Sequence, residues 1–446
     1  MAQVYPFRAF RYNPALAPFD RVLTQPYDKI SPAMQEKYYA ADPHNLIPVE
    51  KGLTYPGDTP QNNVYTRAAA ALEDWIRKSV VTQDPAAAFY VYTQEYTVPG
   101  TEERRTRRGF IGAGKLEEYS ARVVFRHEHT LSGPKADRLE LLRHTKTHTG
   151  QLFMLYSDPQ RRIDAILAEA EADAAPVTEL RDEYGVVHRL RVIAEPSRVA
   201  AIQKAMEGQK LVIADGHHRY ETALIYRNER RARARKIDAD AAYERAPWEL
   251  AMMTFVNARS EGLTILPTHR VAANVHDFSW SGVRRHLEPW FAAEAFPVSD
   301  AGKTAEAQKK FLARLASARE KRAIGVYPAE QKKRAFYVLT LREGANLAQL
   351  LPNVSPRQRE LDVVLLHEGI LEPALGITPQ AVTKEANLTY EREVTAALEA
   401  VDSGRAQISF LLNPCDVEQV MKIATAGEVL PLTCVRLLVF GVSTHW

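Results

Sequence analysis

The sequence predicts a mixed α+β protein, in which helices surround a mixed sheet that contains hairpins. Strand-like and helix-like patterns alternate irregularly along the chain and do not follow a regular βαβ order. A hairpin pattern spans residues 89–116, where two strand-like runs flank Pro99 and Gly100. Because hairpins pair strands in antiparallel fashion, these patterns favour a mixed sheet over a doubly wound parallel one.

The length of the chain predicts more than one domain. Its 446 residues exceed the usual size of a single hydrophobic core. We expect an N-terminal helical and loop segment over residues 1–86 that packs on the core. A central α/β core over 87–275 and a C-terminal α/β domain over 276–446 are expected to follow.

Helix and strand signals near the N-terminus can be assigned one at a time. Ser31 is expected to cap a helix that begins at Pro32, and a longer helix is expected over Val64–Lys78. Phe89–Val98 and Arg104–Leu116 are the two strands of the hairpin. The second strand carries four arginines that we predict to form a solvated edge of the sheet: Arg104, Arg105, Arg107 and Arg108.

The same periodicities predict the remaining elements, with Ser197 as the cap of a helix that ends at Met206. Further strands are expected at Tyr119–Phe125, Gln151–Tyr156, Val186–Ile193, Trp248–Asn257, Ile408–Leu412 and twice within Lys321–Leu341. Further helices are expected at Lys135–Thr147, Ile163–Ala174, Asp362–Leu371 and Leu388–Asp402 and across Val283–Ala318.

Composition narrows the classes of function. The 58 basic and 55 acidic side chains leave a net charge of +3, so global attraction to nucleic acid is not expected. No apolar stretch is long enough to span a membrane, and the two cysteines, Cys415 and Cys434, are too few for a disulfide framework. A cytoplasmic protein is expected. The sequence shows no Walker A motif, dinucleotide fingerprint or nucleophile elbow.

The most informative segment is the run Leu211–Tyr220, in which an apolar strand ends in polar residues and a helix follows. We expect the first turn of this helix near His218, so that its free N–H groups face an anion. Gly216 permits a positive φ or close backbone approach. The predicted phosphate ligands are Gly216, His217, His218 and Arg219. In the alternative interpretation Asp215 caps the helix and the histidines are solvated.

A second polar cluster follows the strand that ends at Phe125. Glu128, flanked by His127 and His129, is a candidate general base, and Lys135 or Arg138 could hold a phosphate. If the strand continued, alternation would place Glu128 on the opposite face from the two histidines. A less favoured hypothesis is a zinc site made of four histidines, with the last two one helical turn apart: His127, His129, His144 and His148.

A third cluster follows the strand predicted at Trp248–Asn257. Glu261 is a second candidate base, and Arg259, His269 and Arg270 are candidate anion contacts. Helix capping and loop solvation would also explain these residues.

The chain resembles an uncharacterised bacterial family, DUF1015. The resemblance rests on Pro26-Tyr27-Asp28, on Arg126 to Thr130 with Lys135, Asp137 and Arg138, on Asp215 to Tyr220, and on Arg259 to Leu263. The corner that contains Gly216 and Arg219 is also similar to the phosphate-binding corner of the ParB and sulfiredoxin-like superfamily, which includes free serine kinases. That resemblance implies a nucleotide-binding core with phosphate at Gly216, His217, His218 and Arg219, and a carboxylate such as Glu128 as the base.

These observations lead to one functional hypothesis and several alternatives. We expect a phosphoryl-transfer enzyme that uses ATP or ADP with Mg²⁺ near Asp215 or Glu261, and that acts on a small hydroxyl substrate such as serine. The alternatives are a phosphatase of a small phosphorylated metabolite, a nucleotide-gated DNA-binding or nuclease module of the partition-protein type, and a scaffold without catalytic activity.

Overall fold

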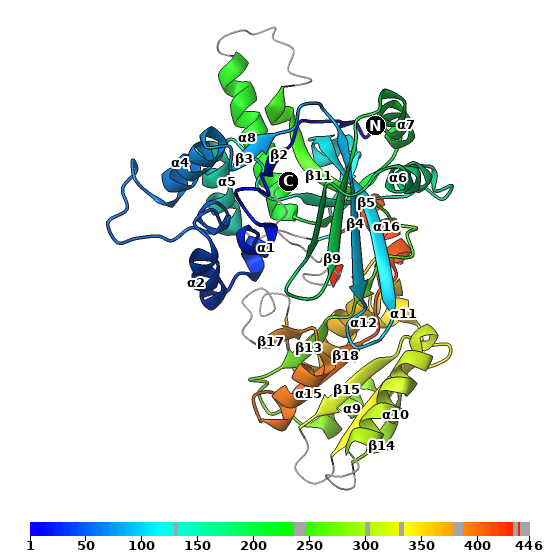
Figure 1. Ribbon diagram of the computed structural model, residues 1–446. Coiled ribbons are helices and arrows are strands. Elements are labelled where there is room, and N and C mark those ends of the chain that lie inside the picture. The colour runs from blue at the N-terminus through cyan, green and yellow to red at the C-terminus, as the bar shows by residue number, and fades with distance from the viewer. Residues whose placement is uncertain are drawn as a thin grey trace. The chain divides into compact units, whose positions relative to one another are not determined.

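The computed structural model describes residues 1–128, 133–235, 246–298, 304–329, 334–378, 387–430 and the short strand β19 (Arg436–Leu437). The described residues form two compact units, one over residues 1–264 and the other over residues 265–437. Both combine helices with a β-sheet (Figure 1). The finer division at residues 86 and 275 stays a prediction.

The first unit contains a nine-stranded mixed sheet in the described residues, with the order β6-β10-β7-β11-β5-β4-β9-β8 and β1 paired to β5. The β6–β10 and β7–β11 pairs are parallel, and the other pairs are antiparallel. The predicted mixed sheet is confirmed. Its strands are β1 (Val4–Tyr5), β4 (Phe89–Thr97), β5 (Arg104–Lys115), β6 (Val124–Phe125), β7 (Leu152–Tyr156), β8 (Thr178–Arg181), β9 (Val187–Ile193), β10 (Leu211–Asp215) and β11 (Leu250–Asn257).

The hairpin of β4 and β5 is confirmed, but β5 is not an edge strand. It pairs with β4 on one side and with β11 on the other. The pairing with β11 covers residues 110–115. Arg107 lies outside it but is still only 1% exposed, and its Nε donates to Gln94 Oε1 at 3.0 Å. The prediction of a solvated arginine edge was wrong for Arg107, whose guanidinium lies over the ring of Phe153, a residue distant in the sequence, whereas Arg104 is exposed.

Three helices build the main hydrophobic core of the first unit against its sheet. Ile163 and Leu167 of α6, Ile202 of α7 and Tyr220 of α8 are buried with Phe255 of the sheet in one cluster. The helices of this unit are α1 (Phe19–Val22), α2 (Pro32–Ala41), α3 (Ile47–Glu50), α4 (Val64–Arg77), α5 (Gly133–Thr145), α6 (Arg162–Asp173), α7 (Pro196–Met206) and α8 (His217–Arg235). Strands β2 (Phe10–Tyr12) and β3 (Val81–Gln83) form a separate pair.

Local predictions were confirmed at some helix ends and wrong at others. Ser31 caps α2 by accepting a hydrogen bond from the backbone N–H of Met34. Glu195, and not Ser197, is the N-cap of α7. The strand expected at Tyr119–Phe125 is divided into a 3-10 turn and the two-residue β6, because Arg122 adopts a left-handed conformation with φ +54°.

The second unit contains an antiparallel sheet with the order β14-β16-β15-β18-β13-β17. Its strands are β13 (His269–Ala272), β14 (Phe291–Pro297), β15 (Ile324–Pro328), β16 (Ala335–Leu341), β17 (Leu388–Glu391) and β18 (Ile408–Leu412), and β12 (Ile265–Leu266) pairs with β19. Its helices are α9 (Trp280–Leu287), α10 (Thr304–Ser317), α11 (Leu347–Leu350), α12 (Asp362–Leu366), α13 (Glu372–Leu375), α15 (Val394–Asp402) and α16 (Val417–Thr425). Helices α10 and α15 supply Phe311 and Leu398 to its core.

Two stretches predicted as helical in this unit contain strands. Residues 291–297 form β14, which pairs with β16 along its whole length, and residues 388–391 form β17, which pairs with β13. Alanine-rich β14 has good helix propensity, so its conformation is set by the partner strand.

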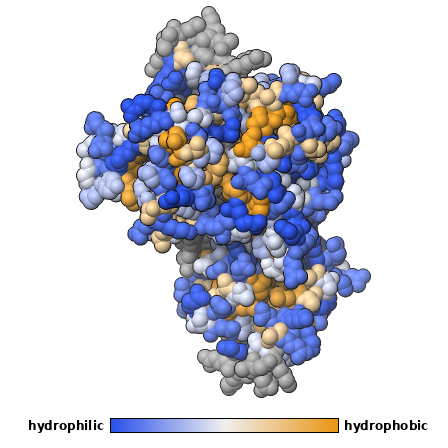
Figure 2. All heavy atoms as spheres, viewed as in Figure 1, coloured by the Kyte–Doolittle hydropathy of each residue, from blue (hydrophilic) through white to orange (hydrophobic). Residues whose placement is uncertain are grey.

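The surface is mainly polar in the view of Figure 2. Within the described ranges, none of the helices is both long and apolar enough to cross a membrane.

Candidate functional site

The candidate site is the corner where β10 ends and α8 begins. Gly216 separates the two elements and has a φ of +93°, which favours glycine. A Cβ atom at this position would lie 3.0 Å from Leu152 Cδ2 and 3.2 Å from Arg219 Cζ. The glycine is thus needed both for the turn and for the close approach of Arg219.

The first turn of α8 lies at this corner. The helix begins at His217, and the N–H group of Tyr220 makes the first bond, to the carbonyl of Gly216. The N–H groups of the preceding residues have no acceptor within the helix, as in the first turn of any α-helix, and the helix dipole adds positive potential there. This geometry suits an anion.

Arg219 turns back over the corner. Its Nη2 donates to Asp215 Oδ2 at 2.5 Å, and its Nη1 donates to the carbonyl of Gln151. A Cβ atom on Gly150 would lie only 3.0 Å from Nη1, so this glycine also makes room for the guanidinium. Because a guanidinium has five N–H donors, these two contacts leave donors for a ligand.

Glu128 and His217 form the closest acid–imidazole pair at the corner. Glu128 Oε1 lies 3.1 Å from His217 Nδ1, and the two side chains are 27% and 3% exposed. The backbone N–H of His127 donates to His217 Nε2 at 3.4 Å. Since Nε2 accepts, the ring proton of His217 is on Nδ1 and points to the carboxylate. His217 therefore orients Glu128.

His127 packs behind this pair. Its ring lies edge-on to the His217 ring, with 4.6 Å between the centroids, and its Nδ1 lies 2.7 Å from the carbonyl of Ile213. A carbonyl only accepts, so Nδ1 carries the proton and Nε2 is left as an acceptor. This buried Nε2 has no hydrogen-bond partner among the described residues. Burial, with the nearby His217, lowers the pKa of His127 to about 4, so the ring is neutral at pH 7.

The pKa of Glu128 results from opposing effects. Burial raises it, but the hydrogen bond from His217 and the neighbouring imidazoles outweigh burial and lower it below its usual value. The carboxylate is therefore ionised near neutral pH. The expected separation of His127 and Glu128 onto opposite faces does not occur, because β6 ends at Phe125 and both residues reach His217.

Lys135 and His218 lie beside this group. Lys135 Nζ is 2.9 Å from Glu221 Oε2, and Arg126 approaches the other oxygen of Glu221 at 3.8 Å. Burial lowers the pKa of half-buried His218, although Glu128 and Glu221 act in the opposite direction. Glu221 was not among the predicted site residues. Its position four residues after His217, one helical turn along α8, is the signal that could have identified it.

Arg138 lies beside a small cavity next to Arg219. Its guanidinium contacts Asp137 at 2.7 Å and Glu50 at 3.7 Å, and it stacks on the Tyr27 ring at 4.4 Å. The cavity has a volume of about 40 Å³, which is room for a few water molecules but not for a nucleoside. A nucleotide at this corner would have to lie outside this cavity.

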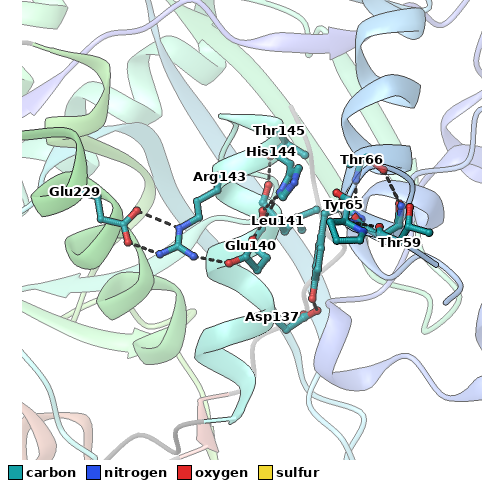
Figure 3. A network of polar contacts seen from close by, with 12 residues as sticks. Thr59, Tyr65, Thr66, Asp137, Glu140, Leu141, Arg143, His144, Thr145 and Glu229 are labelled. Carbon is teal, nitrogen blue, oxygen red and sulfur yellow. Dashed lines mark hydrogen bonds and ion pairs between the residues drawn. The ribbon is translucent and has the colours of Figure 1, made fainter. Parts of the chain in front are cut away.

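Helix α5 is held between α4 and α8 by the network in Figure 3. Arg143 of α5 bridges to Glu229 of α8, and Tyr65 of α4 donates to Asp137 Oδ1 at 3.0 Å. The ring of Tyr65 stacks on His144, with 5.8 Å between the centroids. The network thereby anchors the helix that carries Lys135 and Arg138.

The structure does not support the zinc hypothesis. His129 lies outside the described residues. Since α5 ends at Thr145, His144 and His148 are not one helical turn apart. The Nδ1 of His144 lies 2.8 Å from the carbonyl of Glu140, and the Nε2 of His148 lies 3.2 Å from that of Leu250. Within the described ranges, no group of three or more His, Cys, Asp or Glu residues is placed to hold a metal ion.

The residues of the third predicted cluster make other contacts in the described part of the chain. The Glu261 side chain is 88% exposed and pairs with Arg161 at 3.1 Å, and the backbone N–H of Arg259 donates to Asn257 Oδ1. Arg270 belongs to the second unit, where it is 0% exposed. Its guanidinium donates to the carbonyl of Thr268 and, at 3.2 Å, to His367 Nε2. These internal contacts favour a structural role for Arg270 over phosphate binding.

Comparisons with solved structures show low similarity. A conserved hypothetical protein from Pyrococcus furiosus is 13% identical, with 71% of this chain and 87% of that chain covered and a TM-score of 0.29. A free serine kinase in complex with AMP is 12% identical, with 71% and 84% covered and a TM-score of 0.31. A mutant free serine kinase in complex with ADP gives the same identity and coverage and a TM-score of 0.32.

No curated protein matches the chain. The model of one protein family, described as a protein of unknown function, matches residues 4–364. The match includes the corner of β10 and α8 together with Glu128. The chain belongs to the DUF1015 family.

Proposed function

We propose that this protein is a phosphotransferase that binds a phosphate group of ATP or ADP at the corner of β10 and α8. The observation that carries the proposal is the ionised Glu128, held by His217 at 3.1 Å beside the first turn of the same helix. A phosphate and a base are thereby placed next to each other, as phosphoryl transfer to a hydroxyl group requires. The sequence resemblance of the corner to phosphate-binding corners points in the same direction.

In the proposed reaction Glu128 accepts the proton of a substrate hydroxyl group, while the oxygen of that hydroxyl group forms a bond to the terminal phosphorus. The bond from phosphorus to the bridging oxygen breaks, and that oxygen keeps the electron pair and leaves on ADP, or on AMP if ADP is the donor. The first turn of α8, Arg219 and Lys135 neutralise the transferred charge. Free serine is the first acceptor to test.

Mg²⁺ is the cation expected with such a donor. Mg²⁺ in phosphoryl-transfer sites usually takes one or two carboxylates and completes its shell with phosphate oxygens and water. Asp215 fits this role in part, since its side chain is 44% exposed but Oδ2 is paired with Arg219. Bound Mg²⁺ would supply charge neutralisation at the phosphate, with Asp215 as its protein ligand.

Binding and turnover can be tested separately. In a thermal-unfolding titration, ATP or ADP with Mg²⁺ at a hundred times its dissociation constant should stabilise the protein by about 2.7 kcal/mol. Arg219→Ala should weaken this effect. Arg162→Ala is the matched control, because Arg162 and Arg219 both pair with an aspartate four residues earlier in the chain.

Turnover is tested by incubating the full chain with serine, Mg²⁺ and either nucleotide. Phosphoserine together with ADP or AMP is the expected result. Nucleotide binding without product from serine would reject serine as the acceptor. Absence of any nucleotide-dependent stabilisation would reject the phosphate site itself.

A further inference from the structure

The second unit has a cleft that the proposed function does not use. It has a volume of about 430 Å³ and lies between α9, β14 and β16. Such a volume falls within the range of small-molecule sites. The apolar part of its lining includes the buried side chains of Leu287, Phe291 and Leu339.

Three arginines line this cleft, against a single acidic side chain, Glu288. Arg284 lies 5.8 Å above the ring of Tyr337, and Arg342 Nε donates to the backbone carbonyl of Glu288 at 2.8 Å. Neither these two nor Arg285 forms an ion pair with any described residue. Elsewhere in the unit, Arg314 and Arg322 are paired with Glu294 and Asp362.

The helix dipole explains only part of this arrangement. Arg284 and Arg285 lie in the last turn of α9, where cations are favourable. Arg342 follows β16 and reaches the same cleft from a distant part of the sequence. Three cations around one hollow repel one another, and a bound anion would relieve this repulsion.

We propose that this cleft binds a small organic phosphate with an apolar body. Guanidinium groups match the geometry of phosphate oxygens, and the apolar part of the lining accepts the organic part of the ligand. This site is independent of the corner of β10 and α8, so either proposal can fail without the other.

The test uses the full chain and a fluorescent probe with the same chemistry, 8-anilinonaphthalene-1-sulfonate, displaced by 1-naphthyl phosphate. We expect saturable binding and displacement. The double substitution Arg284→Gln with Arg342→Gln should weaken binding of both molecules about tenfold or more. Arg405→Gln is the control, because Arg405 is exposed, outside the cleft and also without an ion pair in the described part of the chain.

Equal affinity of the double variant and the wild type would overturn the proposal, and so would failure of 1-naphthyl phosphate to displace the probe. If the double variant does not fold, the single substitution Arg285→Glu tests the proposal instead. This exposed charge reversal should weaken 1-naphthyl phosphate binding more than Arg405→Glu does, and equal affinities of the two would again overturn the proposal.

Discussion

Buried histidines occur in both units, but their surroundings differ. In the first unit, burial lowers the pKa of His127 to about 4, and its neighbour His217 holds the partly exposed carboxylate of Glu128. In the second unit, burial and the charge of Arg270 lower the pKa of His269 to about 4 and that of His367 to about 3. Burial alone therefore does not distinguish an imidazole of the proposed site from a packing one. The difference is a neighbouring carboxylate within reach of solvent.

The largest effect is expected at that carboxylate. Glu128→Gln should lower kcat for phosphoryl transfer about 10²–10⁴-fold, because a general base contributes that much. Glu261→Gln, at the other predicted base, should leave kcat unchanged. Steady-state assays of both variants decide between the two acids. A normal kcat for Glu128→Gln with a loss in Glu261→Gln would transfer the role to Glu261.

In the second unit, substitution of a buried arginine should lower the stability of the protein. Arg270→Leu removes a buried guanidinium that bonds Thr268 and His367, and we expect a loss of about 3 kcal/mol in the free energy of unfolding. Denaturant unfolding at pH 7 measures it. Arg405→Leu, at an exposed position, should change stability by no more than about 0.5 kcal/mol. A similar small change for Arg270→Leu would contradict the structural role.

The pH dependence of stability tests whether buried His127 is neutral in the folded protein. Between pH 6.5 and about 4 the unfolded chain protonates this residue while the folded chain does not, so the free energy of unfolding falls as the pH falls through this window. The contribution is at most about 1.36 kcal/mol per pH unit. His127→Phe should cost about 1 kcal/mol at pH 7 through the lost bond to Ile213, but its stability should fall less steeply towards pH 4.5. The free energy of unfolding is measured with urea at each pH for both proteins. Parallel curves of this free energy against pH would contradict a buried, neutral His127.

A last comparison concerns the turn of the corner. Gly216→Ala combines a positive φ with close contacts to Leu152 and Arg219, and it should cost about 1–3 kcal/mol of unfolding free energy. Gly100→Ala is the matched control, because φ there is +76° and a Cβ atom would meet nothing within 4 Å. The excess loss at Gly216 measures the contacts alone. Equal losses would show that Arg219 and Leu152 move aside freely.

The sequence by itself determined the local features of this protein. The hairpin of β4 and β5, the cap of α2 at Ser31 and the change from strand to helix around Gly216 were all predicted, because each depends on neighbouring residues. The same locality made the corner with His217, His218 and Arg219 visible as a candidate site.

The tertiary structure decided what depends on residues far apart in the chain. The ring of Phe153 packs against buried Arg107, β16 holds alanine-rich β14 as a strand, and His217 meets Glu128 from a segment about ninety residues earlier. Local periodicity contains no information about such partners, because hydrogen bonding between strands and burial of a side chain depend on which distant segment packs against it.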